Sequence, residues 1–490
     1  MMDINILEKI NFGEIDGYGD PNLEKYFLDN DYWNKIIEND IFFVVGKKGT
    51  GKSSIYRMLD KEAIKRGSLV INKDFGDFPF EKLLQLKDDN FAKPNQYQTI
   101  WKNLILNLFI HNIAKLPIEN NEFFDQIVKY DNTYLKNAID LHKEVVIKTI
   151  KKQGNLVFKN IGYAGESSSN DTFGRGEENI SQINIALSEL ILNFFITSNY
   201  ENNIIIQFDR LDDNYNQYQD IEEYYQAIIS LFKTVYGFNQ LLRSKSIKNA
   251  KVVLYIRSDI MKAMGNRDAE SARWDDFRYD LSWNVNNMKD INNSDLLKMI
   301  DKRIRTSSLD TTNLTFAKVF EIPTSELKKC GIKYTLFGSL VLQTLFRPRD
   351  LIKFAKTLQM EVVREKTFND SIYKTALKKY SNWLVNTEIA NEINPVLGVD
   401  YKYVIELLRL CGSRTLSVKV FTERYHSIKH QFKFKPLELL EFLYSVGIIE
   451  NIWKDKFGKY MHRSIFRNEG DFDRNLQLRI LPAVWTGLTV

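Results

Sequence analysis

The chain has 490 residues, of which 44% are hydrophobic and 27% charged, a composition that excludes a disordered or low-complexity protein. The chain is too long to fold around one ordinary hydrophobic core, and its length predicts roughly two to four domains. The two cysteines, Cys330 and Cys411, lie far apart without metal-ligand spacing, which argues against a disulfide framework and a zinc site. The first 20 residues are acidic and glycine-dotted, unlike a signal peptide, so we expect a cytoplasmic protein.

Four short apolar segments predict the strands of a parallel sheet. Residues 41–45 form a continuous apolar run that ends at Gly46, and strands that are buried on both faces lack alternation. Residues 69–72, 203–208 and 252–256 have a similar character. Helical patterns separate these runs, and such alternation favours an α/β fold with helices on both faces of the sheet.

The segment after the first strand matches the phosphate-binding pattern G-x-x-x-x-G-K-[ST] in full, between a strand and a helix. Glycines let backbone N–H groups point at phosphate oxygens, and the following helix presents its positive end to them. We expect Lys52 to bind the β- and γ-phosphates as a catalytic residue and the Ser53 hydroxyl to ligate Mg²⁺. The predicted ligands are ATP (or GTP) and Mg²⁺, bound by Gly46, Lys48, Gly49, Thr50, Gly51, Lys52, Ser53 and Ser54.

A helical insertion is predicted at about residues 92–200. Helical periodicity runs through 96–150, and a polar stretch, Gly162–Glu178, follows as a predicted mobile loop. The apolar stretch Ile180–Thr197 includes Gln182, Asn184, Ser188, Glu189 and Asn193, so we interpret it as a buried amphipathic helix and expect no membrane contact.

The third predicted strand ends in Asp209, whose carboxylate is the expected second Mg²⁺ ligand beside the glycine loop. Arg210 follows it, so the common Asp-Glu pair is absent and the water-activating acid must come from elsewhere. Asp213, with Asp212 close behind, is the preferred candidate, although both residues fit a turn-capping role equally well.

Several arginines are candidates for stabilising phosphoryl charge. Arg257 or Ser258, at the end of the fourth strand, is expected next to the phosphate loop, with an ordinary ion pair as the alternative. Arg349 could reach the nucleotide from a helical lid, and a capping or surface role is as plausible. Arg267 and Arg273 are weak candidates for residues that complete a neighbour's site in an oligomer.

The C-terminal half predicts helices and a small strand pair. Residues 294–307 and 335–390 have amphipathic helical patterns, which favours a helical lid. The last ninety residues predict helices at about 402–411, 415–427 and 436–446, then strands at 448–453 and 460–466, the order of a winged helix. We expect a core at 1–290, a lid at 291–395 and a winged-helix domain at 396–490.

The C-terminal module is mildly basic, with 15 Lys and Arg against 9 Asp and Glu in residues 401–490. Its third helix carries Glu438 and Glu441 and no base-reading Arg or Asn, so it is a poor major-groove helix. Nucleic acid therefore remains possible, and protein contact is favoured. The residues that could bind phosphates are Lys454, Lys456, Lys459 and Arg463.

Together these motifs resemble the AAA+/STAND-like P-loop ATPases of bacteria, and more narrowly a family often found beside phage-defence genes. The resemblance rests on Phe12-Gly13, Leu23 to Phe27, GKKGTGKSS from Gly46, FDRLDD from Phe208, IRSDI from Ile256, Leu281 to Trp283, Lys302 to Ile304, RPRD from Arg347 and the tail from Leu481 to Leu488. It implies an ATPase that drives a conformational change or assembly, as a homo-oligomer or with a separate effector. It also implies that the acid cluster of Asp212 and Asp213 positions water. The rival hypotheses are a nucleotide-gated scaffold with negligible turnover and a DNA-dependent motor or loader.

Overall fold

The computed structural model describes residues 4–76, 83–84, 95–135, 176–211, 221–285, 288–307, 314–332, 335–467 and 470–488. The chain divides into two compact units. The sheet unit comprises Asn30–Lys47 and Ile55–Leu281, and the helical unit comprises Met1–Asp29, Lys48–Ser54 and Ser282–Val490. Each unit has a hydrophobic core of its own.

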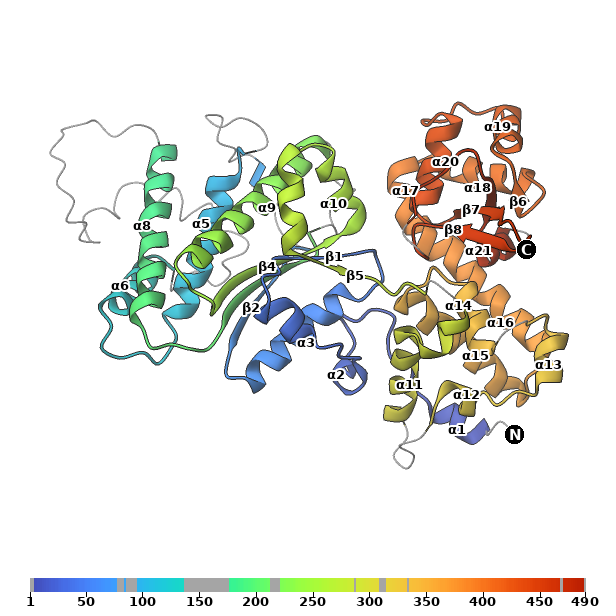
Figure 1. Cartoon of the computed structure of the whole chain (residues 1–490), viewed down its shortest axis with the longest axis horizontal. Coiled ribbons are helices and arrows are strands. Elements are labelled where there is room, and N and C mark those ends of the chain that lie inside the picture. Colours follow the sequence, from blue (N-terminus) through green and yellow to red (C-terminus); the bar gives the residue numbers. More distant parts are fainter. Residues whose placement is uncertain are drawn as a thin grey trace. The chain divides into compact units, whose positions relative to one another are not determined.

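A five-stranded parallel sheet organises the sheet unit, in the order β2-β3-β4-β1-β5 (Figure 1). All described positions of β1, β3 and the first seven of β4 are buried, as expected for strands covered on both faces. The parallel sheet predicted from the four apolar runs is confirmed. The strands are β1 (Phe43–Gly46), β2 (Leu69–Asp74), β3 (Ile204–Asp209), β4 (Ala250–Arg257) and β5 (Arg278–Leu281).

Side-chain alternation assigns the two faces of this sheet. Phe43 of β1 stacks on Phe232 of helix α9 (Ile221–Ser244), with ring centroids 4.6 Å apart, so this face packs on α9. On the other face, the Gln207 amide donates to the Tyr56 carbonyl of α3 (Lys52–Lys65) and accepts from the Tyr255 hydroxyl. Because successive strand residues point to opposite faces, Asp209 shares the α3 face with Gln207.

Helix α5 packs on α6, α8 and α9 in the sheet unit. The Trp101 indole of α5 donates to the Ala227 carbonyl of α9, and the Asn103 amide of α5 donates to Asn184 of α8. The described helices that accompany the parallel sheet are η1 (Trp33–Glu38), α3 (Lys52–Lys65), α5 (Gln98–Ile113), α6 (Glu122–Tyr130), η2 (Asp131–Leu135), α8 (Gly176–Thr197), α9 (Ile221–Ser244), α10 (Ser258–Gly265) and η4 (Ala269–Phe277).

Helix α8 contains the apolar stretch Ile180–Thr197, which by length and composition alone could cross a membrane. In the structure 56% of that stretch is buried, against α5 and α6. The predicted helical insertion thus corresponds to α5, α6 and α8 within the described residues. Of the predicted mobile loop, residues 162–175 lie outside the described residues, and α8 begins at Gly176.

The helical unit begins with a leader that packs on α11. The Arg303 guanidinium donates to the Phe12 carbonyl and lies 4.2 Å from the centre of the Tyr26 ring. The Tyr26 hydroxyl in turn donates to the Asp20 carboxylate. These contacts bring together several of the residues on which the family resemblance rests. The elements here are α1 (Ile4–Lys9), α2 (Leu23–Tyr26), η5 (Met288–Asn293) and α11 (Asp295–Ser307).

Helices dominate the next part of the helical unit, as the amphipathic patterns predicted. Thr335 and Asn369 cap two of these helices by accepting from backbone N–H groups. The segments are α12 (Phe316–Val319), α13 (Thr324–Lys329), α14 (Leu336–Leu342), α15 (Pro348–Glu365), α16 (Asp370–Trp383), the π-helix η6 (Leu384–Ile389) and α17 (Ala390–Leu397).

The C-terminal part adds an antiparallel sheet in the order β6-β9-β7-β8. The strands predicted at 448–453 and 460–466 correspond to β7 and β8. The sequence did not predict β6 and β9, because these strands are short and partly polar. The elements are α18 (Asp400–Leu410), β6 (Thr415–Leu416), α19 (Val418–Ser427), α20 (Pro436–Ser445), β7 (Ile449–Lys454), β8 (Tyr460–Arg463), β9 (Gln477–Ile480) and α21 (Pro482–Leu488).

Candidate functional site

Three consecutive carbonyl groups of the glycine-rich loop accept hydrogen bonds from other residues of the helical unit, to which Lys48–Ser54 also belong. The Lys48 carbonyl accepts from Arg347 Nη1 at 3.0 Å, and the Gly49 carbonyl accepts from the Arg349 backbone N–H at 3.4 Å. The Thr50 carbonyl accepts from the Trp283 indole at 2.8 Å. Side chains and backbone from outside the loop therefore hold three adjacent peptide groups in one orientation.

This orientation fixes the direction of the backbone N–H groups. In a planar trans peptide the C=O of one residue and the N–H of the next point in opposite directions. The N–H groups of Gly49, Thr50 and Gly51 thus point away from the residues that bind the carbonyls. Gly49 and Gly51 have φ of +78° and +99°, the left-handed backbone that builds an anion-binding nest. The loop leads directly into α3, which begins at Lys52.

Close packing explains why two positions near the loop are glycine. A Cβ atom on Gly49 would lie 3.2 Å from Arg349 Cβ and 3.4 Å from Arg347 Nε. A Cβ atom on Gly17 of the leader would lie 2.0 Å from the Ser54 hydroxyl oxygen. The leader and the start of α15 therefore both approach the loop to within contact distance of its backbone or first helical turn.

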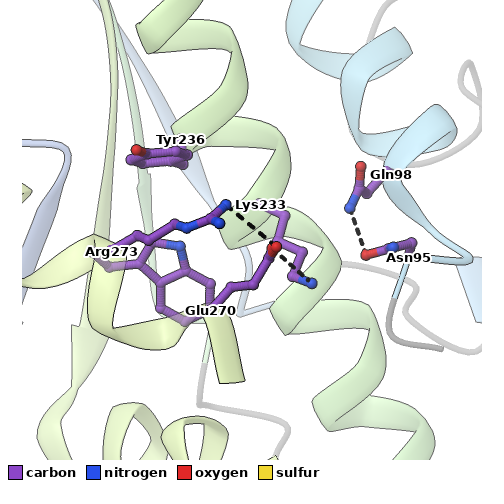
Figure 2. Close-up of a pocket in the computed structure, with 7 residues that line it drawn as sticks. Asn95, Gln98, Lys233, Tyr236, Glu270 and Arg273 are labelled. Carbon is purple, nitrogen blue, oxygen red and sulfur yellow. Dashed lines mark hydrogen bonds and ion pairs between the residues drawn. The ribbon is translucent and has the colours of Figure 1, made fainter. Parts of the chain in front are cut away.

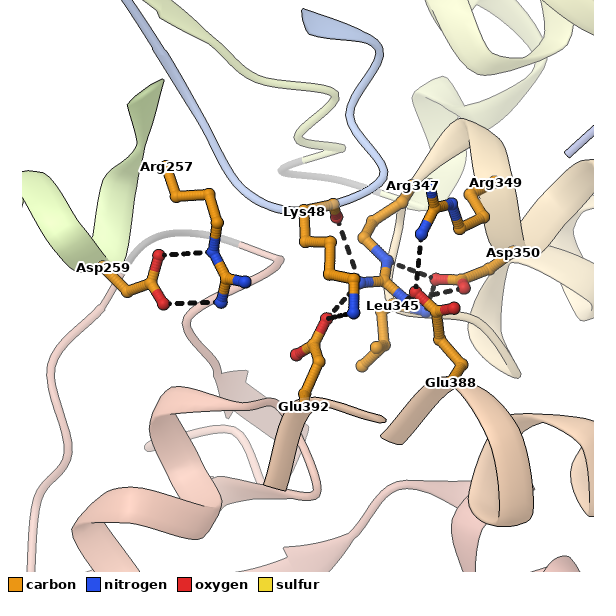
Figure 3. A network of polar contacts seen from close by, with 9 residues as sticks. All are labelled: Lys48, Arg257, Asp259, Leu345, Arg347, Arg349, Asp350, Glu388 and Glu392. Atoms are coloured by element: carbon orange, nitrogen blue, oxygen red, sulfur yellow. Dashed lines mark hydrogen bonds and ion pairs between the residues drawn. The ribbon is translucent and has the colours of Figure 1, made fainter. Parts of the chain in front are cut away.

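A buried ion pair anchors the Arg347 contact (Figure 3). Arg347 Nε and Nη2 each lie 2.8 Å from a carboxylate oxygen of Asp350, and these side chains are 1% and 0% exposed. Asp350 lies in the first turn of α15, where the helix N-terminus stabilises negative charge. This bidentate geometry is the strongest form of an arginine–carboxylate pair and fixes the guanidinium plane.

Two glutamates extend this pair into a six-residue ion network (Figure 3). Glu388 Oε1 lies 3.1 Å from Arg347 Nη2 and 3.4 Å from Arg349 Nη1. Glu392 Oε1 lies 3.3 Å from Arg347 Nη1 and 3.8 Å from Lys48 Nζ. Three cations thus face three carboxylates, with Asp350 as the third acid.

The network favours the charged forms of Arg347 and Glu388, whereas burial raises the pKa of Asp350 despite its pairing with Arg347. Burial alone would lower the pKa of Arg347, but the charge and hydrogen bonds of Asp350, with Glu392 and Glu388, outweigh it and raise that pKa. Burial opposes ionisation of Glu388, yet the positive charges of Arg347, Arg349 and Lys48 lower its pKa overall. Glu388 is therefore a carboxylate at neutral pH.

The sheet unit carries the other predicted site residues at the carboxyl ends of its strands. Arg257 ends β4 directly opposite Gly46 in the β1–β4 register. Its guanidinium forms a bidentate ion pair with Asp259, with N–O distances of 3.0 and 2.6 Å (Figure 3). Arg257 thus lies next to the start of the glycine loop, with its charge shared by a neighbouring acid.

Asp209 ends β3 and is 2% exposed. Its register partner on β2 is Asp74, so two acids lie side by side at this edge of the sheet. Arg210 leaves the strand in a left-handed conformation, φ +60°, and its Nη1 lies 2.9 Å from Asp74 Oδ2. Arg210, which replaces the common glutamate, is therefore turned toward β2. The remaining acids, Asp212 and Asp213, lie outside the described residues.

The two arginines considered for an oligomer contact lie within the sheet unit. Arg267 pairs with Glu222 and covers the Tyr225 ring at 4.1 Å. Arg273 lies 3.3 Å from Glu270, on the wall of a polar cavity of about 210 Å³ (Figure 2). Lys233, on the same wall, pairs with Glu270 at 3.3 Å, so internal carboxylates balance the cavity's charge. The lining residues are Asn95, Gln98, Lys233, Tyr236, Glu270, Arg273 and Trp274.

Sequence reasoning missed the residues that hold the loop from outside. Trp283 and Arg347 belong to segments that carry the resemblance, but no pattern in the sequence links either residue to a particular carbonyl. Glu388 and Glu392 lie four residues apart on one helical face, and that spacing alone is common on solvated helices. Their role becomes visible only when the fold brings them to Lys48 and Arg349.

One protein family matches part of the chain. Residues 294–387, about a fifth of the chain, match the family described as the FunZ-associated C-terminal helical domain. The match spans α11 to α16 and most of η6, and it includes Arg347, Arg349 and Asp350. A comparison with curated proteins finds none that matches the chain.

Proposed function

We propose that the chain is a Mg²⁺-dependent P-loop ATPase whose nucleotide cycle drives a conformational change or assembly. The observation that carries this proposal is that the carbonyl groups of Lys48, Gly49 and Thr50 all accept hydrogen bonds from residues outside the loop. The N–H groups of the same peptides, those of Gly49, Thr50 and Gly51, therefore point away from these donors, and they directly precede the N-terminus of α3. A glycine-rich nest that opens a helix is the arrangement that binds phosphate groups.

The strand order supports the same proposal. β4 lies between β1 and β3, and β5 lies at the edge, an order compatible with the AAA+-like core that the sequence resembles. Asp209 lies on the sheet face that packs on α3 through Tyr56, and α3 is the helix that the glycine loop opens. Asp209 therefore lies on the face of the sheet that is covered by α3.

Each residue has a distinct role in the proposed reaction. Lys52 binds the β- and γ-phosphate oxygens, and the N–H groups of the loop hold the chain of phosphates. The Ser53 hydroxyl and the Asp209 carboxylate hold Mg²⁺, which neutralises charge on the phosphates when bound. Arg257 stabilises negative charge at the reacting phosphoryl group, and Asp213, or Asp212 beside it, orients the attacking water. Arg349 reports nucleotide occupancy to the helical part of the chain.

The proposed biological role is that of the ATPase component of a bacterial antiphage defence system in the cytoplasm. FunZ, with which the matched helical domain is associated, is associated with defence systems. We propose that the chain works as a homo-oligomer or with a separate effector protein, without membrane contact. Loss of phage protection in cells that carry Lys52→Ala, with normal protein levels, tests this role.

Steady-state phosphate release tests the enzymatic proposal. We expect Mg²⁺-dependent release by the wild type that disappears in Lys52→Ala and in Asp213→Asn. Lys61→Ala, on the exposed side of the same helix α3, is the matched control and should retain wild-type release. Tight nucleotide binding without turnover in the wild type would instead support the rival scaffold or sensor.

A basic hairpin favours a second candidate, the DNA-dependent motor or loader with a C-terminal winged helix. The turn between β7 and β8 carries Phe457, which is 82% exposed, between Lys456 and Lys459. Lysine-rich tips bind phosphates without sequence preference and in a strongly salt-dependent manner. Phosphate release that DNA stimulates, with the stimulation lost in a Lys454→Glu, Lys456→Glu, Lys459→Glu variant, would establish this candidate in place of protein contact.

A further inference from the structure

The six-residue ion network contains one fixed pair and two loose ones. Arg347 and Asp350 are fully buried and make two bonds of 2.8 Å. Lys48–Glu392 and Arg349–Glu388 are longer, at 3.8 and 3.4 Å. The cations of these outer pairs are partly exposed, with 27% of the Lys48 and 24% of the Arg349 side chain accessible. The two glutamate side chains are only 7% exposed, so in these long pairs it is the cations that can exchange partners.

The two loose cations belong to the segments that form the loop's surroundings. Lys48 is a loop residue, and Arg349 donates its backbone N–H to the Gly49 carbonyl. Both side chains are long and flexible, so each can turn toward an anion bound in the loop. A triphosphate offers several ionised oxygens, which compete directly with a single carboxylate for such cations.

We propose that Glu388 and Glu392 form an acidic latch that competes with nucleotide phosphates for Arg349 and Lys48. The inference rests on the proposed function of the glycine loop. When Lys48 and Arg349 turn to the phosphates, Arg347 alone faces three carboxylates: Asp350, Glu388 and Glu392. Two uncompensated negative charges in a buried network are unfavourable, so Glu388 and Glu392 move away from Arg347. Nucleotide binding thereby releases the segment that carries them.

The segment itself is suited to such a change. Glu388 lies in the π-helix η6, and Glu392 lies in α17, which follows without a break. π-Helical turns inside α-helices are uncommon and concentrate at functional sites, because the extra residue strains the helical hydrogen bonding. Loss of the two outer pairs removes the contacts that tie this junction to Lys48 and Arg349. We therefore expect that nucleotide binding makes residues 384–397 less rigidly held.

The test compares the full-length wild type with Glu388→Gln/Glu392→Gln. Calorimetry measures the Kd for Mg²⁺ with a non-hydrolysable ATP analogue, and thermal unfolding without nucleotide checks that the variant is folded. Glutamine keeps the size of glutamate and one acceptor oxygen but removes the charge, so we expect about tenfold tighter binding. Glu361→Gln is the matched control, because Glu361 is a buried acid on α15 paired with Lys379 and Arg364, and its Kd should equal that of the wild type.

A second readout does not depend on affinity. Hydrogen–deuterium exchange of residues 384–397 should rise when the analogue binds to the wild type, and should already be high in the double variant. Should the double variant unfold, Glu392→Gln alone, which leaves Glu388 on Arg347, should still tighten binding by about threefold.

The outcomes separate the latch from the function on which it rests. Wild-type binding with an equal or weaker affinity in the glutamine variants overturns the latch and leaves the nucleotide site intact. Nucleotide binding that is detected only in the glutamine variants supports a latch in which the two glutamates prevent measurable binding to the wild type. Absence of binding in every variant overturns the nucleotide site and the latch together.

Discussion

The guanidinium of Arg347 donates a hydrogen bond of 3.0 Å to the main-chain carbonyl of Lys48, which lies 299 residues earlier in the chain. The same guanidinium is held in a bidentate pair by Asp350. A buried arginine at the start of α15 thus fixes the orientation of a peptide group in the glycine loop. The helical part of the chain thereby helps to shape the surface on which we propose that nucleotide binds.

Replacement of Arg347 by Met should destabilise the helical unit strongly. Removal of one partner of a buried ion pair leaves the others uncompensated, which typically costs about 3–5 kcal/mol. Chemical denaturation measures the change in the free energy of unfolding. The control is Arg364→Met on the same helix, where the arginine side chain is 58% exposed and pairs with Glu361 and Glu365, so a change below about 1 kcal/mol is expected. Similar costs for the two variants would contradict the anchoring role of Arg347.

Gly49→Ala should cost more stability than Gly458→Ala. The two glycines have nearly equal φ, +78° and +77°, so alanine pays about the same backbone penalty at both, roughly 1 kcal/mol. Only at Gly49 does the added methyl group also meet neighbours, since nothing lies within 4 Å of a Cβ on Gly458. The extra overlap with Arg349 and Arg347 should add about 1 kcal/mol in denaturant titrations.

The same pair of variants also distinguishes steric crowding from backbone strain when the Kd for nucleotide is measured. Gly49→Ala should weaken nucleotide binding because it displaces Arg347 and Arg349, whereas Gly458→Ala should leave the Kd unchanged. Equal stability of the two variants would mean that α15 does not press against the loop backbone.

Gly17→Ala and Ser54→Ala should show strong coupling. A methyl group on Gly17 would lie 2.0 Å from the Ser54 hydroxyl oxygen, so Gly17→Ala should destabilise the protein by about 1–3 kcal/mol. Removal of that oxygen in the double variant should recover most of the loss, because the next nearest atom, Ser54 Cβ, lies 3.3 Å away. A double-mutant cycle by thermal unfolding measures the coupling. Additive effects would show that the leader does not approach Ser54.

The two cysteines should differ in their reaction with a thiol reagent. Burial raises the pKa of Cys411 to about 11, and its side chain is almost fully enclosed, so few thiolates form there at pH 8. Burial also raises the pKa of Cys330, but that residue is partly exposed. Ellman's reagent at pH 8 should therefore modify Cys330 first and Cys411 only after denaturant is added. Variants Cys330→Ala and Cys411→Ala assign the two phases, and rapid labelling of native Cys411 would contradict its burial.

The central strands could be predicted because their burial on both faces leaves a continuous apolar run. β1 and β4 follow such runs closely, and β1 ends at Gly46 as the end of its apolar run predicts. β5 was missed, since Arg278, Tyr279 and Asp280 carry no apolar signal at the exposed sheet edge. Edge strands gain their stability from pairing with a neighbour, and composition does not report that pairing.

The loop could be predicted from local chemistry, and its supports could not. Glycine spacing and a lysine–serine pair act within eight residues, so one segment contains the whole signal. The contacts from Trp283 and Arg347 depend on tertiary packing across more than 230 residues. The acid that activates water stays a prediction at Asp212 or Asp213, as do the roles of Lys52, Ser53, Asp209 and Arg257.

The most direct measurement is amide hydrogen exchange of the loop, residues 46–54, with and without Mg²⁺ and a non-hydrolysable ATP analogue. Because the N–H groups of Gly49, Thr50 and Gly51 point away from the bound carbonyls, the account predicts that saturating analogue slows their exchange at least tenfold, with no such change in Lys52→Ala. Calorimetry on the same samples establishes saturation. Unchanged exchange of this loop in protein that is saturated with nucleotide would contradict the account.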